Sequence, residues 1–248
     1  MQAPPRTRRN RTPYAIIGGA AVAAAAIVGG ALMIPSVSGA AGGEASAAEE
    51  VARVSERPAL GHARDPLSAE ELSYALHLAT TDASLPEDVT SVDGSDAPQV
   101  LSIDIATRDV DSDARTADVV LYDYTSNRAF LQAVNLADGT VTSSATQGVQ
   151  PPPSADEVDF AFSVFLGDTV ASDAVRAEFA AVTGDALSSI DQLGVTGGAF
   201  VPDAGTVGAD ACAIDRCVEM QFRIPGGGYL DTTGFVVDLS TRSVIGIQ

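Results

Sequence analysis

Apolar residues recur at helical spacing in the segment that follows Ser68. Ser68-Ala69-Glu70-Glu71 places a hydroxyl at a helix start and acids in the first turn, the pattern of a capping box. The apolar positions after it are Leu72, Ala75, Leu76 and Ala79. We therefore predict a helix from Ala69 with this stripe buried. His77 falls roughly opposite the stripe, so we expect it to be exposed.

Four stretches with strand character follow this helix. Leu101, Ile103 and Ile105 alternate with Ser102 and Asp104. The predicted strands cover residues 101–105, 118–124, 129–136 and 140–146. Asp138-Gly139 is typical of a two-residue hairpin turn. One helix and four antiparallel strands define a compact α+β unit.

The same order of elements then occurs a second time. After Pro151-Pro152-Pro153, the residues from Ser154 to Phe162 match those from Ser68 to Leu76 in kind at nearly every position, at a constant offset of 86. A further helical stretch covers 172–182, and predicted strands cover 198–201, 218–224, 233–239 and 243–247. We predict two tandem copies of helix plus four strands, at 65–150 and 151–248, after a polar linker at 48–64.

The first 47 residues have the order of a bacterial export signal. Arg6, Arg8, Arg9 and Arg11 precede an apolar stretch at 14–34, and small residues follow. Arg8-Arg9 is a twin-arginine pair, although Asn10-Arg11-Thr12 replaces the usual apolar pair after it. Two outcomes remain open: cleavage after Ala40 or Ala47, or retention of 14–34 as a membrane anchor. In both, the chain beyond residue 48 lies outside the cytoplasm.

Charge narrows the classes of function. The chain of 248 residues has a formal net charge of −19, and all 14 basic residues are Arg. Without Lys, a catalytic lysine, a P-loop lysine and a lysine Schiff base are impossible. Because phosphate neutralisation needs a basic surface, we expect no nucleic-acid partner. The acidity favours solubility, and it can also steer cationic partners.

Cys212 and Cys217 are the two cysteines. In an exported chain we expect them to form a structural disulfide that closes a small loop. A metal site needs further ligands, and neither His lies near them in sequence. Redox catalysis is typical of C-x-x-C, and this spacing is longer.

Several short motifs are similar to those of one known protein family. The entry segment, from His62 to Leu72, reads H-A-R-D-P-L-S-A-E-E-L. It resembles the H-P-L-D-P-L-S/T-x-x-E-I entry of the first N-terminal module of copper-containing amine oxidases. Residues 115–121, 127–136 and 139–141 are similar to its strand pattern. Gly148-Val149-Gln150-Pro151-Pro152, followed by Glu157, resembles the junction into its next module. The resemblance covers residues 58–248 and implies two cystatin-like modules, each a helix packed on a four-stranded antiparallel sheet.

The catalytic parts of that family have no counterpart here. Its catalytic domain would follow Gln248, with a quinone-forming tyrosine in N-Y-D/E and three copper-binding histidines. Only Tyr122 precedes an acid, and Leu121 stands before it in place of Asn. His62 and His77 are the two histidines. The resemblance therefore implies a pair of modules without catalytic or copper residues.

Three other motifs match known functional sites only in part. Asp109, Asp111 and Asp113 begin like a calcium loop, but Ala114 and Val120 stand where an EF-hand needs Gly and Glu. The loop Pro225-Gly226-Gly227-Gly228 lies between strands and lacks a lysine, so we predict a hairpin turn. A Ser/His/Asp hydrolase would need His62 or His77 as its base, and no G-x-S-x-G occurs.

These observations lead to one main hypothesis. We expect an exported, non-catalytic protein without cofactors, which acts by binding an extracytoplasmic protein partner or by assembly and contacts a membrane only through an uncleaved 14–34. The alternatives are an accessory subunit of a copper/quinone amine oxidase and a weak calcium-binding surface protein.

Overall fold

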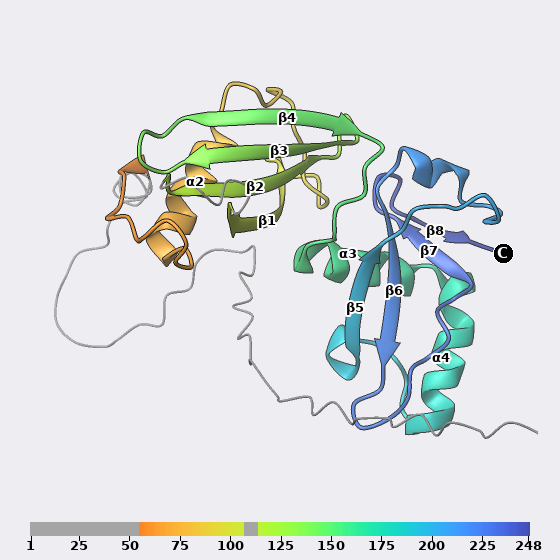
Figure 1. Ribbon diagram of the computed structural model, residues 1–248. Coiled ribbons are helices and arrows are strands. Elements are labelled where there is room, and N and C mark those ends of the chain that lie inside the picture. Colours follow the sequence, from red (N-terminus) through yellow and green to blue (C-terminus); the bar gives the residue numbers. More distant parts are fainter. Residues whose placement is uncertain (1–54, 107–113) are drawn as a thin grey trace, which may run out of the picture.

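The computed structural model describes residues 55–106 and 114–248 (Figure 1). The predicted leader over 1–47 and the calcium-loop candidates Asp109, Asp111 and Asp113 lie outside these residues. In the part of the chain that is described, no helix is long and apolar enough to cross a bilayer.

The first module packs one helix on an antiparallel sheet. Helix α2 (Ala69–Thr80) covers strands β1 (Gln99–Ile105), β2 (Thr116–Asp123), β3 (Arg128–Asn135) and β4 (Val141–Gln147), which lie in the order β1-β2-β3-β4. Tyr74, Ala75 and Ala79 of the helix are buried in one cluster with Leu121 and Phe130. The small side chains of Ala75 and Ala79 let the helix pack close to the sheet, and Tyr74 is the aromatic residue that α2 adds to this core.

The second module repeats this plan and adds a helix. Helices α3 (Ala155–Gly167) and α4 (Thr169–Thr183) precede the sheet β5-β6-β7-β8. The strands are β5 (Gly194–Ala199), β6 (Cys217–Arg223), β7 (Phe235–Asp238) and β8 (Ser243–Gly246), and short 3-10 turns cover Ile190–Gln192 and Asp210–Ala213. Phe162, Phe165, Phe222 and Phe235 form its core, with the Phe165 and Phe235 rings stacked at 4.6 Å.

The predicted fold class is confirmed: the chain is α+β, with two tandem cystatin-like modules. Both predicted helix starts are confirmed as capping boxes. The hydroxyl of Ser68 accepts from the Glu71 N–H at 3.2 Å, and that of Ser154 accepts from the Glu157 N–H at 3.2 Å. The Pro225–Gly228 loop forms the predicted hairpin turn, in which the Gly227 N–H donates to the carbonyl of Ile224 at 2.8 Å.

Three local predictions need correction. The fifth strand begins at Gly194 and not at residue 198, because three glycines in it hide the alternation of side chains. The loop between β3 and β4 covers residues 136–140, which is longer than the predicted two-residue turn, and Gly139 is left-handed in it (φ 75°). On α2, Leu72 and Leu76 are only half-buried, and so is His77, because the buried face is rotated toward Tyr74.

Candidate functional site

A groove opens in the second sheet where β6 and β7 separate. The two strands pair only at Cys217–Asp238 and Val218–Val237. At the far end, a bridge between Arg223 and Tyr229 closes the gap. Between these points, the described chain makes no strand pair with β6 on this side. The local cause is a turn at Asp231, whose carboxylate accepts from the N–H and the hydroxyl of Thr233 at 3.1 and 2.7 Å.

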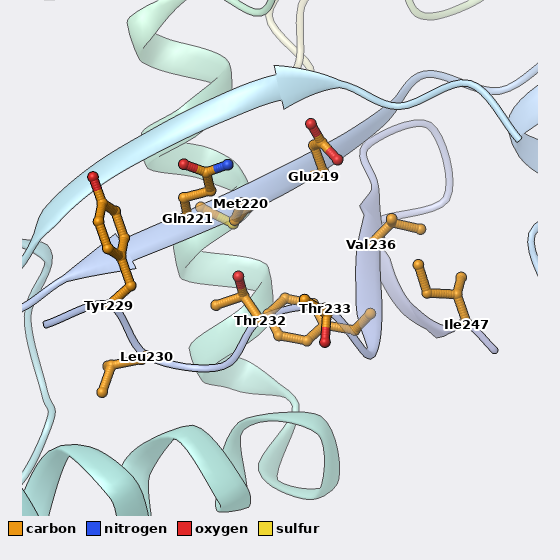
Figure 2. Close-up of a pocket in the computed structure, with 10 residues that line it drawn as sticks. Glu219, Met220, Gln221, Tyr229, Leu230, Thr232, Thr233, Val236 and Ile247 are labelled. Atoms are coloured by element: carbon orange, nitrogen blue, oxygen red, sulfur yellow. The ribbon is translucent and has the colours of Figure 1, made fainter. Parts of the chain in front are cut away.

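The groove has an apolar floor and a polar rim. It encloses about 390 Å³, and its floor residues Met220, Leu230 and Phe235 are buried. Figure 2 shows Tyr229 and Glu219 toward opposite ends, with Gln221 between them. The lining is completed by Thr232, Thr233, Val236 and Ile247. Such a combination suits an apolar group flanked by hydrogen-bonding atoms.

The predicted disulfide is confirmed. Cys212 and Cys217 are joined, with their Cα atoms 5.5 Å apart, and both residues are buried. The ring that they close includes Asp215 and Arg216.

The two histidines do not meet at a site. The carbonyl oxygen of His62 accepts from Arg115 Nη1 at 2.6 Å, and that of His77 accepts from the Thr81 hydroxyl at 2.7 Å. Across the described ranges, no group of three or more His, Cys, Asp or Glu side chains is arranged to hold a metal ion.

A buried ion pair occurs at the same place in both modules. Arg115 binds Glu71 at 2.7 Å, and Arg216 binds Glu157 at 2.9 Å. Each arginine directly precedes the second strand of its sheet. The carbonyl oxygen of each arginine also accepts a hydrogen bond from the N–H of a leucine that follows the third strand. The distance is 2.9 Å for Arg115 and 2.8 Å for Arg216. These pairs are not predicted from the sequence, although the offset of 86 aligns the two glutamates.

The surroundings of these pairs shift pKa values. Hydrogen bonds from Arg115 lower the pKa of Glu71 from 4.5 to about 2, although burial opposes this effect. Burial raises the pKa of the Tyr124 hydroxyl well above its usual range, and the Glu157 carboxylate beside it raises that pKa further. Burial also raises the pKa of Asp215. Tyr124 therefore stays protonated and acts as a hydrogen-bond donor.

The second ion pair lies at the contact between the modules. Tyr124 of the first module donates to Glu157 at 2.6 Å. The guanidinium of Arg216 lies 5.3 Å from the centre of the Tyr122 ring. Asn127, in the turn between β2 and β3, donates to Asp215 at 2.8 Å and accepts from Ser240 at 2.7 Å. A network of charges and hydroxyl groups thus joins the modules.

These features define the class as an α+β protein built from two joined cystatin-like modules. No protein-family model matches the sequence, and no curated protein matches it. Among solved structures, the chain is similar to a copper-containing benzylamine oxidase from Hansenula polymorpha, at 14% identity and a TM-score of 0.44. The match covers 76% of this chain and 30% of that one, so the chain spans less than a third of the oxidase. Because this similarity is low, the fold class is assigned from the two observed sheets and their helices, and not from the comparison.

Proposed function

We propose that this chain is an exported, non-catalytic binding protein that holds an extracytoplasmic protein partner at the groove beside β6. The groove carries the proposal. Its floor of Met220, Leu230 and Phe235 is apolar, and its rim offers a carboxylate, an amide and a phenol for hydrogen bonds. A partner would insert an apolar side chain and bond to the rim with polar groups.

The rim of the groove and the charge of the chain also restrict the chemistry of a partner. Tyr229 at the rim is 66% exposed, and its ring lies 5.9 Å from the guanidinium of Arg223. Aromatic residues of this kind are common anchors of protein interfaces. The net charge of −19 favours a partner with a basic or neutral surface.

Site-specific photo-crosslinking in the producing cells tests this proposal. A photoreactive phenylalanine analogue replaces Gln221 at the rim, and a matched control replaces the exposed Asp173 on α4. We expect one discrete protein adduct from position 221 and none from position 173. Thr232→Trp, which fills the groove, is expected to abolish that adduct. Absence of an adduct at 221, or the same adduct at 173, would contradict the proposal.

The identity of the adduct also tests the alternatives. If it contains a copper/quinone amine oxidase, the chain is an accessory subunit, and its addition should change peroxide release from an amine. If it contains no oxidase and peroxide release is unchanged, that alternative is wrong. Binding of calcium by Asp109, Asp111 and Asp113 is tested by calorimetric titration, in which no heat would eliminate it.

Export is tested by the intact mass of the protein recovered outside the cytoplasm. We expect a mass that lacks residues 1–40 or 1–47. A mass that includes 14–34 would show that this stretch is kept as an anchor.

A further inference from the structure

The segment that connects the two modules is hydrogen-bonded to the ring that the disulfide closes, which comprises residues 212–217. Gln150 lies in the segment that joins β4 to α3 (Figure 1). Its amide nitrogen donates to the carbonyl oxygens of Cys212 and Asp215, at 3.2 and 2.6 Å. Its amide oxygen accepts from the Cys217 N–H and from Arg216 Nη1, both at 3.4 Å. One side chain of the connection therefore contacts the ring from Cys212 to Cys217.

The same ring presents two side chains to the first module. Asp215 accepts from Asn127 at 2.8 Å, and Arg216 lies over the ring of Tyr122. Arg216 also donates to the carbonyl of Pro151 at 2.6 Å, one residue after Gln150. The ring thus contacts both the connection and the β2–β3 end of the first module.

The first module provides an internal comparison. Its Arg115–Glu71 pair is buried like the second pair, and it forms without a disulfide. There, Arg115 donates to carbonyl groups of its own entry segment, at His62 and Pro66. The disulfide is therefore not needed to form an Arg–Glu pair of this kind. What distinguishes the second pair is its contact with the neighbouring module.

We propose that the Cys212–Cys217 disulfide fixes the relative orientation of the two modules. It does so by shaping a ring that binds Gln150 and presents Asp215 and Arg216 to the first module. The second sheet keeps a defined direction relative to the first sheet only while this ring is closed. This inference does not depend on the proposed binding function.

Residual dipolar couplings of the backbone N–H groups in the full chain test the inference. In the wild type, couplings from β1–β4 and from β5–β8 should fit one common alignment tensor. In Cys212→Ser/Cys217→Ser, each sheet should keep its internal couplings, but the two sheets should require different tensors. The control is Gly184→Ala, which strains the left-handed cap of α4 (φ 82°), outside the joint. It should retain one tensor.

A second variant makes the test independent of folding without the disulfide. Gln150→Ala keeps the disulfide and removes the four hydrogen bonds between the Gln150 side chain and residues 212–217, so it should also separate the two tensors. A double-serine chain that folds and keeps the wild-type orientation would overturn the proposal. If that chain does not fold, a wild-type orientation in Gln150→Ala overturns it. Separate tensors in Gly184→Ala would also overturn it, because general destabilisation would then explain the effect.

Discussion

At the scale of single residues, this protein differs from one with a purely apolar core because it buries several polar side chains. Glu71 and Glu157 are both nearly inaccessible, and each is compensated by an arginine and by backbone N–H groups. Removing one partner of such a pair leaves an uncompensated buried charge, which typically costs about 3–5 kcal/mol. These residues are therefore required for the native structure.

The Glu71 pair predicts a dependence of stability on pH. Because the folded pKa is about 2 and the ordinary value is 4.5, the folded state favours the ionised carboxylate. This stabilisation is complete above pH 4.5 and is lost as the pH falls toward 2. The shift corresponds to about 3 kcal/mol. Urea unfolding at a series of pH values measures it, and Glu71→Gln should remove most of this contribution. An unchanged pH profile in that variant would contradict the assignment.

Gln132 predicts a stabilising substitution. Its side chain is fully buried on β3, and neither atom of its amide has a hydrogen-bond partner in the described structure. A buried, unsatisfied amide costs about 1–3 kcal/mol. We expect Gln132→Met, which keeps a similar shape, to raise the free energy of unfolding by about 1 kcal/mol.

A second buried glutamine serves as the control for this prediction. Gln99 accepts from the Val92 N–H and donates to the Ser154 hydroxyl. Gln99→Met should therefore destabilise the protein, and thermal unfolding of both variants measures the two effects. Equal effects at the two positions would show that hydrogen bonding does not decide the outcome.

At the scale of elements, the two helix starts are the clearest repeated feature. A capping box is a local interaction between residues three apart, so it was readable from Ser68 and Ser154 in the sequence. By contrast, β5 was misplaced because its glycines carry no side chain that could alternate. Local patterns predict elements well where side chains interact within the element, and poorly where they do not.

The helix caps differ in their surroundings, which gives a prediction. Ser68→Ala removes one cap bond and should cost about 1 kcal/mol. Ser154→Ala should cost more, because the Ser154 hydroxyl also accepts from Gln99 of the first module at 3.2 Å. Denaturant unfolding of both variants measures the difference. A smaller loss for Ser154→Ala would contradict a role for this hydroxyl in the joint.

At the scale of the whole molecule, the contact between the modules combines polar bonds with apolar packing of Val92 and Tyr124 against the core of the second module. Two turns reach across it in opposite directions. Asn127, left-handed with a φ of 51°, reaches the second module, and Arg242, left-handed with a φ of 56°, donates to the carbonyl of Val92 in the first. Polar contacts of this kind depend on geometry, so the orientation of the modules depends on the groups that hold these turns in place.

The disulfide predicts a modest effect on global stability. A ring over residues 212–217 is short, and the loop-closure entropy that it removes from the unfolded chain is worth about 2 kcal/mol. Cys212→Ser/Cys217→Ser should therefore lower the free energy of unfolding by about this amount, as measured in guanidinium chloride. A much larger loss would show that the ring also supports the core of the second module.

The sequence alone determined the fold class, the two helix starts, seven of the eight strands within a few residues and the Cys212–Cys217 bond. These follow from interactions between near neighbours: periodic burial, caps and a short ring. Only the tertiary structure revealed the groove beside β6, the Arg–Glu pairs and the joint at Asn127, Gln150 and Arg216. The side-chain bonds of the Arg–Glu pairs and of the joint at these three residues connect positions 44 to 113 residues apart along the chain. Contacts at such separation leave no periodic signal, because they exist only after the sheets have formed and the modules have met.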